Sequence, residues 1–228
     1  MKPRNTVAQT ESCTGLTLDL IEHDGRFFLE CEGRQMDSSK LGHPARTIVS
    51  LMSRPFRPAK QPRILFLGLG FGHALTMARK ALPQEKASFV IFPEAAQLPR
   101  WFSEHLAGQL AEDPLDDERV HLESASPFDL IPQEYAGCQG IVADLDQLDA
   151  LAPKKWSISS ESVLAGYYER LKNGGLLALI SSRPVQKLEK ALKKSGFDLA
   201  IDLVPFSEKS KKNRTLYLAR KGHYQRSH

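Results

Sequence analysis

The glycine-rich segment Gly68-Leu69-Gly70-Phe71-Gly72 constrains the fold more than any other part of the chain. It follows the wholly apolar residues 64–67, which predict a strand buried on both faces, and it opens a helical pattern over residues 71–81. Glycines allow a sharp turn, and bare backbone lets a ligand approach the free N–H groups at the start of a helix. In an open α/β sheet this is the crevice where a nucleotide binds, and a tight turn kept only for packing is the alternative.

Strand and helix patterns alternate from this segment to the end of the chain. Alternation of this kind predicts a mostly parallel sheet covered by helices on both faces, with right-handed crossovers. We therefore expect a Rossmann-like α/β domain with a closing antiparallel hairpin. The expected strands are residues 64–67, 89–92, 119–122, 141–143, 176–180, 199–204 and 215–219, and the expected helices are residues 71–81, 99–111, 160–171 and 184–194.

The N-terminal quarter has a different pattern, in which short strands are joined by tight turns. Residues 16–21 and 26–31 flank an Asp-Gly pair, which is a strong signal for a hairpin turn. A third short strand is expected at 34–36 and a helix at 44–56, and a proline-punctuated linker follows over 54–62. The expected organisation is a flexible arm over residues 1–14, a small β-domain with a helix over 15–58, a Rossmann-like domain over 59–222, and a tail over 223–228.

Composition excludes several classes of protein. The 228 residues are 41% hydrophobic and 25% charged, values typical of a globular chain and not of a disordered one. No apolar run approaches the length of a membrane span, and the N-terminus lacks the apolar stretch of a secretory signal, so a cytoplasmic location is expected. The three cysteines form no Cys-x-x-Cys pair, and no histidine pair has metal-binding spacing, which argues against a disulfide framework and against a metal site.

Charge is distributed unevenly along the chain. Residues 1–150 carry 15 Lys and Arg against 21 Asp and Glu, whereas residues 151–228 carry 16 against 6. Such asymmetry can mark a surface that binds a polyanion, and residues 207–214 were expected to form an exposed basic loop. A solvated basic helix and loop is the simpler interpretation, because a charge excess alone specifies no partner.

The glycine spacing bears on which nucleotide the crevice would hold. Gly-x-Gly-x-Gly is the pattern of S-adenosylmethionine folds, and His73 stands where a dinucleotide-binding motif has its third glycine. Both kinds of fold use an acid at the end of the second strand to accept hydrogen bonds from ribose hydroxyls. Here that place is Pro93, and Glu94 follows one residue later, where a side chain would face the other side of a continuing strand. Glu94 is thus either a ligand contact or an exposed loop acid.

At this point the chain resembles the spermidine-synthase-like proteins, a branch of the S-adenosylmethionine methyltransferase fold. The resemblance covers about 200 residues, from Gly25 onward. The segments that carry it are DGRFFLECEGRQMDSSKLGHP (the small β-domain), PRILFLGLGFGHAL (the glycine signature), PEAAQLPRWFSEHL, GIVADLDQL, YYERLKNGGLLALIS and the closing hairpin. It implies a seven-stranded methyltransferase-fold sheet preceded by a small β-hairpin domain, with Gly68, Gly70, Gly72, Glu94 and Ser126 as the cofactor-binding positions.

The resemblance also implies a reaction. In the family, decarboxylated S-adenosylmethionine donates an aminopropyl group to a polyamine, without a metal. Asp144 matches the family's catalytic aspartate, and Asp146 is the candidate residue for binding the amine. A carboxylate at a strand end can accept a proton and attract an ammonium group. The structural alternative for Asp-x-Asp at this place is a loop cap or the start of a helix.

Departures from the family pattern leave other functions open. Pro93 replaces one acid, and Ser126 occupies the place of the aspartate that holds the adenine amino group. Gln147-Leu148-Asp149 replaces the Asn-Gly-Pro that often follows the second aspartate. A non-catalytic descendant that acts as a binding or scaffold module is therefore the second hypothesis. A methyltransferase acting on nucleic acid, suggested by the basic C-terminal portion, is the third. The family often forms homodimers, but nothing in this sequence marks a self-complementary patch.

The hypotheses differ in what the crevice should look like. An enzyme predicts an open cleft lined by Gly70, Glu94 and Asp144. A scaffold predicts a crevice filled by bulky neighbours such as Phe71, Phe92 or Trp101.

Overall fold

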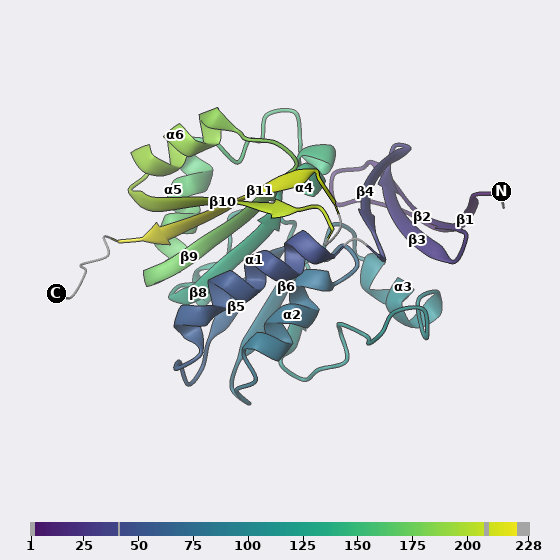
Figure 1. Cartoon of the computed structure of the whole chain (residues 1–228), viewed down its shortest axis with the longest axis horizontal. Helices are drawn as coiled ribbons and strands as arrows, with labels where there is room; N and C mark the ends of the chain where they lie inside the picture. The colour runs from purple at the N-terminus through teal and green to yellow at the C-terminus, as the bar shows by residue number, and fades with distance from the viewer. Residues whose placement is uncertain (1–2, 41, 208–209, 223–228) are drawn as a thin grey trace.

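A computed structural model describes residues 3–40, 42–207 and 210–222 of the chain. Its main element is a seven-stranded sheet in the order β10-β11-β9-β8-β5-β6-β7 (Figure 1). The five strands β5 to β9 run parallel, and β11 and β10 close the sheet in antiparallel fashion, which confirms the predicted fold class. The strands are β5 (Arg63–Leu67), β6 (Ser88–Phe92), β7 (Val120–Leu122), β8 (Cys138–Asp144), β9 (Leu171–Ser181), β10 (Phe197–Pro205) and β11 (Asn213–Lys221).

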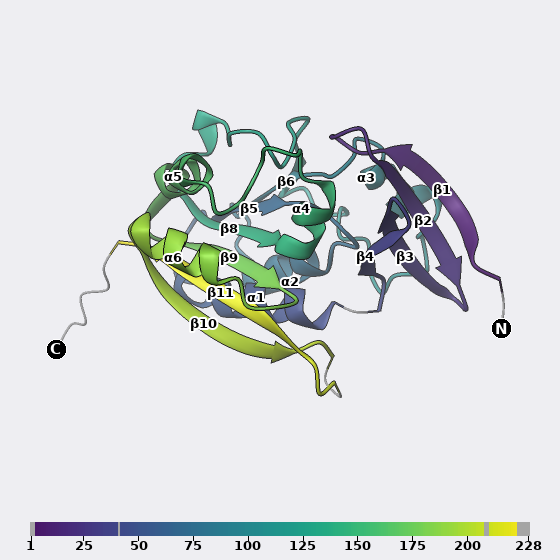
Figure 2. The ribbon, with the colours of Figure 1, turned by 90° about the horizontal axis from the view of Figure 1, so that it is seen from above.

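Helices cover both faces of this sheet because its central strands are apolar on both sides. On one face, Ile64 and Phe66 pack against α1 (His43–Ser53) and α2 (His73–Ala81). On the other, Leu65 and Leu67 belong to the layer formed with α4 (Leu145–Leu151), α5 (Glu161–Arg170) and α6 (Gln186–Lys194). Figure 2 shows α1 and α5 on opposite sides of the sheet. In the described part of the chain, no helix has both the length and the apolar character that a membrane crossing requires.

A separate four-stranded antiparallel sheet lies at the N-terminal end, in the order β1-β2-β3-β4 (Figure 1). Its strands are β1 (Asn5–Glu11), β2 (Thr17–His23), β3 (Arg26–Cys31) and β4 (Arg34–Ser38). The expectation of a loose arm over residues 1–14 is wrong for residues 5–11. They form strand β1 because pairing with β2 satisfies their backbone groups, which their polar composition did not reveal.

The two sheets share one core. Leu18, Leu20 and Leu29 of the N-terminal sheet belong to the same buried cluster as Ile64 of the main sheet. Helix α3 (Leu98–Glu104) contributes Trp101 to this cluster, so the small sheet packs against the larger domain through apolar contacts. This arrangement places β4 beside the carboxyl ends of the parallel strands, where the candidate site lies.

Several elements differ from expectation in extent. Helix α3 ends at Glu104, well short of the expected residue 111, and the short 3-10 helix Arg54–Phe56 occupies part of the expected linker. Helix α4 follows β8 directly and was not expected. Strand β11 begins at Asn213, so Arg214 belongs to the sheet and not to the exposed basic loop predicted for residues 207–214. Residues 208–209 of that loop and the expected tail at 223–228 lie outside the described residues.

Candidate ligand-binding crevice

The glycine segment forms the expected turn between β5 and α2. Gly68, Gly70 and Gly72 have φ values of 109°, 51° and 71°, a region that side chains disfavour, so the turn depends on glycine at these positions. The turn points three backbone N–H groups toward the carboxyl edge of the sheet. In this structure each of these N–H groups donates a hydrogen bond to a carboxylate of the chain itself.

Glu94 accepts two of these hydrogen bonds. Its carboxylate oxygens lie 2.7 Å from the Leu69 nitrogen and 3.0 Å from the Gly70 nitrogen. The residue is 1% exposed, and this burial raises the pKa of its carboxyl group above the usual value. Glu94 therefore lies beneath the turn, where it holds the loop, and a ribose hydroxyl could reach it only after the surroundings move.

Asp37 accepts the hydrogen bond from the third amide of the turn. This residue comes from β4 of the N-terminal sheet, and its Oδ2 atom lies 2.9 Å from the Phe71 nitrogen. A Cβ atom added to Gly70 would collide with this same carboxylate and would lie 3.4 Å from Gln147 Nε2. The small sheet thus reaches across and binds the backbone of the turn directly.

The loop between β1 and β2 contacts Glu94 and Ser126, two of the positions that the resemblance implies for cofactor binding. The Cys13 nitrogen donates to the Glu94 carbonyl at 2.8 Å, and the Thr14 hydroxyl donates to the Leu151 carbonyl at 2.8 Å. Ser126, the position that the resemblance implies for adenine binding, donates its hydroxyl to the Cys13 sulfur at 3.4 Å. Polar groups that could recognise a nucleoside are thus bonded to the first loop of the chain.

Asp144 and Asp146 meet a guanidinium group at the end of β8. Arg214 donates to the two Asp144 oxygens at 2.7 and 2.8 Å, and it also donates to Asp146. The Asp144 and Arg214 side chains are only 14% and 13% exposed, and burial raises the pKa of Asp144 against the opposing effect of Arg214. The bidentate pair is the strong form of an arginine–carboxylate contact, so Arg214 holds Asp144 in a fixed position.

The same two aspartates also begin helix α4. Asp144 is the N-cap, and its Oδ1 atom accepts a hydrogen bond from the Asp146 nitrogen at 3.0 Å. Asp146 in turn accepts from the nitrogen and the hydroxyl of Ser182 at 2.8 and 2.9 Å. The helix-start alternative for Asp-x-Asp therefore describes what both residues do in this structure.

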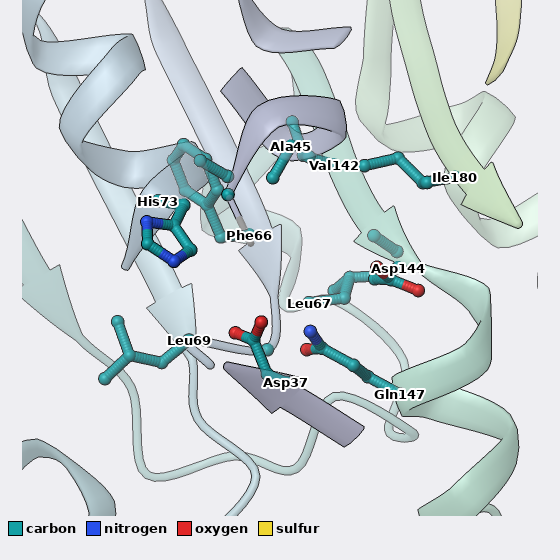
Figure 3. A pocket seen from close by; sticks show the side chains of 14 residues that line it. Asp37, Ala45, Phe66, Leu67, Leu69, His73, Val142, Asp144, Gln147 and Ile180 are labelled. Atoms are coloured by element: carbon teal, nitrogen blue, oxygen red, sulfur yellow. The ribbon is translucent and has the colours of Figure 1, made fainter. Parts of the chain in front are cut away.

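A small cavity remains between these groups. Its volume is about 50 Å³, far below the roughly 300–1,000 Å³ of typical small-molecule sites. Asp37, His73, Asp144 and Gln147 contribute to its lining (Figure 3). Gly70 and Glu94 are not among the lining residues, and Phe71, Phe92 and Trp101 are buried in the core on either side of the sheet. The structure thus matches neither the open cleft nor the aromatic plug, because polar side chains of the chain itself fill the crevice.

S-adenosylmethionine does not fit the crevice in this arrangement. The cavity is too small for a nucleoside, and the three turn amides already have acceptors. The carboxylate suited to a ribose is buried, and the hydroxyl at the adenine position is bonded to Cys13. Within the described residues, no group of three His, Cys, Asp or Glu side chains could hold a metal ion.

The sequence placed the glycine turn, Glu94, Asp144 and Asp146 at one edge of the sheet, and the structure brings them together there. It missed Asp37 and Arg214. Arg214 was assigned to a loop, although the alternation of Arg214, Leu216 and Leu218 along β11 was a usable signal for one strand face. Asp37 had no such signal, because its contact with Phe71 depends on how the two sheets pack.

The fold is that of the spermidine synthases and the S-adenosylmethionine-dependent methyltransferases. Spermidine synthase from Thermotoga maritima matches with a TM-score of 0.70 at 15% identity, over 95% of this chain and 72% of that chain. A spermidine synthase in complex with the transition state analogue AdoDATO matches with the same values. A predicted O-methyltransferase from Agrobacterium tumefaciens has a TM-score of 0.52 and 21% identity, over 78% of this chain and 81% of that chain.

Sequence comparison gives no further assignment. No family model matches the chain, and no curated protein matches it. Because the structural matches are below 25% identity, they define the fold, and the function has to be argued from the site.

Proposed function

We propose that this chain is a non-catalytic protein of the spermidine-synthase fold, which acts as a binding or scaffold module. The observation that carries the proposal is the bidentate contact of Arg214 with Asp144. Asp144 matches the position of the family's catalytic base, and a base must be able to take a proton from the amine. In this chain both of its oxygens accept hydrogen bonds from an arginine that stays protonated at any physiological pH, and this positive charge opposes the uptake of a proton by the carboxylate.

Each part of the ligand expected in this fold has a counterpart in the chain itself. The Arg214 guanidinium pairs with Asp144 and Asp146, the carboxylates that would bind an ammonium group. Glu94 and Asp37 accept hydrogen bonds from the amides of the turn, and the Ser126 hydroxyl donates to Cys13 of the first loop. A ligand would have to displace buried, charge-assisted hydrogen bonds in three separate segments, each worth about 1.5–3 kcal/mol.

Ligand binding to the purified full-length chain tests this proposal. S-adenosylmethionine, decarboxylated S-adenosylmethionine and methylthioadenosine are each added at millimolar concentration, and the melting temperature is measured. We expect no shift, whereas a spermidine synthase measured in parallel as a positive control should be stabilised by its ligand. A saturable shift with any of the three compounds would contradict a crevice closed by the chain's own side chains.

A second candidate function is aminopropyl transfer from decarboxylated S-adenosylmethionine to a polyamine, and the charge of the crevice favours it. Asp144 and Asp146 share one guanidinium, that of Arg214, whereas Asp37 and Glu94 accept hydrogen bonds from the amides of the turn. Burial raises the pKa of both Glu94 and Asp144, and the charge of Asp37 raises both further, so these carboxylates repel one another. A sulfonium or ammonium group bound among them would relieve that repulsion.

A turnover assay separates the two candidates. The chain is incubated with decarboxylated S-adenosylmethionine and putrescine, and methylthioadenosine is quantified as the released product. The non-catalytic proposal expects no product above the protein-free control. Product formation that falls at least a hundredfold in Asp144→Asn, with Asp149→Asn as the matched control, would instead establish the transferase.

A further inference from the structure

A second and larger cavity lies on the other side of the glycine turn, between the starts of α1 and α2 and the segment that follows α3. Its volume is about 360 Å³, which lies within the range of small-molecule sites. Lys40, Arg46 and Lys80 line it, together with Phe71, His73 and Glu112. It therefore combines a cationic lining with an aromatic wall, in contrast to the acidic crevice described above.

Two of the three cationic groups have no carboxylate partner in the described part of the chain. Lys80 pairs with Glu112 at 2.5 Å, but neither Lys40 nor Arg46 has an ion pair with any described residue. Glu112 is the only carboxylate among the described residues that line the cavity. Three formal positive charges thus face one negative charge across a concave surface, which is an arrangement that attracts anions.

Close packing positions the Arg46 guanidinium. A Cβ atom added to Gly42 would collide with the His73 ring and would lie 2.6 Å from Arg46 Nη1. Arg46 is itself half-buried on the first turns of α1, and Phe71, which also lines the cavity, is 4% exposed. The glycine at position 42 thus makes room for the His73 and Arg46 side chains, and the guanidinium lies against the Gly42 backbone.

We propose that this cavity binds a small phosphorylated ligand. A phosphate group offers several acceptor oxygens in the geometry that an arginine fork matches, and the two lysines add further donors. The volume exceeds what a bare phosphate fills, so an organic part would pack against Phe71 and Leu110. Thr76 and Gln109 supply uncharged hydrogen-bonding groups at the same wall.

This site is distinct from the acidic crevice and does not depend on the function proposed for it. His73 lines both cavities, and its Nε2 atom lies 3.0 Å from the Ser38 carbonyl oxygen. The acidic crevice would repel a phosphate, whereas the cationic cavity would attract it. Ligand binding at one cavity can therefore be measured while the other is altered.

Titration calorimetry with inorganic phosphate and with pyrophosphate, at constant ionic strength, tests the proposal. We expect one saturable site per chain and tighter binding of pyrophosphate, because it engages more of the cations. Arg46→Gln should weaken binding by at least about tenfold, as expected for loss of a charged hydrogen-bond donor. Arg46→Lys should retain an intermediate affinity, and a phosphate monoester with an apolar group should bind more tightly than phosphate itself.

Arg54→Gln is the matched control, because Arg54 is exposed at the far end of α1 and its substitution removes the same charge. It should leave the affinity within about twofold. Circular dichroism and melting temperature establish that each variant is folded. The proposal is overturned if no saturable binding occurs at millimolar phosphate, or if Arg46→Gln and Arg54→Gln weaken binding equally.

Discussion

Arg214 changes the chemistry of two aspartates without altering the strand that presents them. Its guanidinium binds both Asp144 oxygens and reaches Asp146, so one positive charge offsets half of the negative charge of the two carboxylates. Its Nε atom is buried and has no partner among the described residues. The contact therefore fixes the charges tightly but leaves one donor unsatisfied, which limits how much it adds to stability.

Removal of Arg214 should destabilise the fold. Arg214→Gln leaves the Asp144 carboxylate buried without its counter-ion, and breaking a buried pair in this way costs about 3–5 kcal/mol. Urea unfolding measures the change. The double variant Arg214→Gln/Asp144→Asn should recover at least half of the loss, because no unpaired charge remains. Equal instability of the single and double variants would show that the pair is not the cause.

Glu94 should make stability depend on pH. Burial raises the pKa of its carboxyl group in the folded chain, so the folded state binds this proton more tightly than the unfolded state. The resulting stability is fully present below the unfolded pKa and is lost as pH rises through the folded pKa. The melting temperature should therefore fall as the pH rises above the ordinary range of a glutamate carboxyl group in the native chain, and less so in Glu94→Gln. Parallel pH profiles for the two proteins would assign the dependence to other groups, such as Asp144.

The site residues differ in how far sequence could predict them. The glycines and Asp144 follow strand ends directly, so their place at the carboxyl edge was predictable from the alternation of strands and helices. The direction in which the Glu94 side chain points was not predictable in this way, because it is set by the turn that follows Phe92. The partners Asp37 and Arg214 come from segments 34 and 70 residues away from the groups they bind, and such contacts exist only once the elements pack.

At the scale of elements, the glycine turn depends on close packing as well as on backbone conformation. Gly72 begins α2 with a left-handed φ of 71°, and a Cβ atom added there would collide with the Pro114 ring. Gly108 has a similar φ of 73°, but nothing lies within 4 Å of its added Cβ. A comparison of the two positions therefore separates the free-energy cost of a left-handed backbone from the additional cost of a steric collision.

Alanine substitution at these two glycines should give different losses of stability. Gly108→Ala should cost about 1 kcal/mol, which is the conformational penalty alone. Gly72→Ala should cost about 2–4 kcal/mol, because overpacking against Pro114 adds to that penalty. Denaturant unfolding of both variants supplies the comparison. Similar losses would mean that the Pro114 segment moves away at little cost.

Elements with a clear apolar pattern were predictable, and the others were not. The parallel strands have nearly continuous apolar runs, and α6 has apolar residues at helical spacing. Strand β1 is polar on its exposed face, and its existence depends on the pairing with β2. Helix α4 is only seven residues long, and it is stabilised by the Asp144 cap and by buried Leu145, Leu148 and Leu151, a pattern too short to recognise with confidence from spacing alone.

The whole molecule should unfold as one unit. The apolar residues of the N-terminal sheet belong to the same buried cluster as the main sheet, so the small sheet has no core of its own. Leu20→Ala should cost about 2–5 kcal/mol, as expected for a large-to-small change in a core. Calorimetry should show a single transition that shifts as a whole, whereas Leu203→Ala, at a side chain that is 64% exposed, should leave it nearly unchanged. Two transitions, of which Leu20→Ala lowers only one, would show that the sheets fold independently.

The groups that fill the crevice come from separate parts of the chain: the first loop, β4, the segment after β6, and β11. Each substitution that would free one of them leaves another buried charge or amide without its partner. A variant with a crevice open to a nucleoside would therefore need substitutions in several distant segments together, because any single one exposes the unpaired partner of the group that it removes.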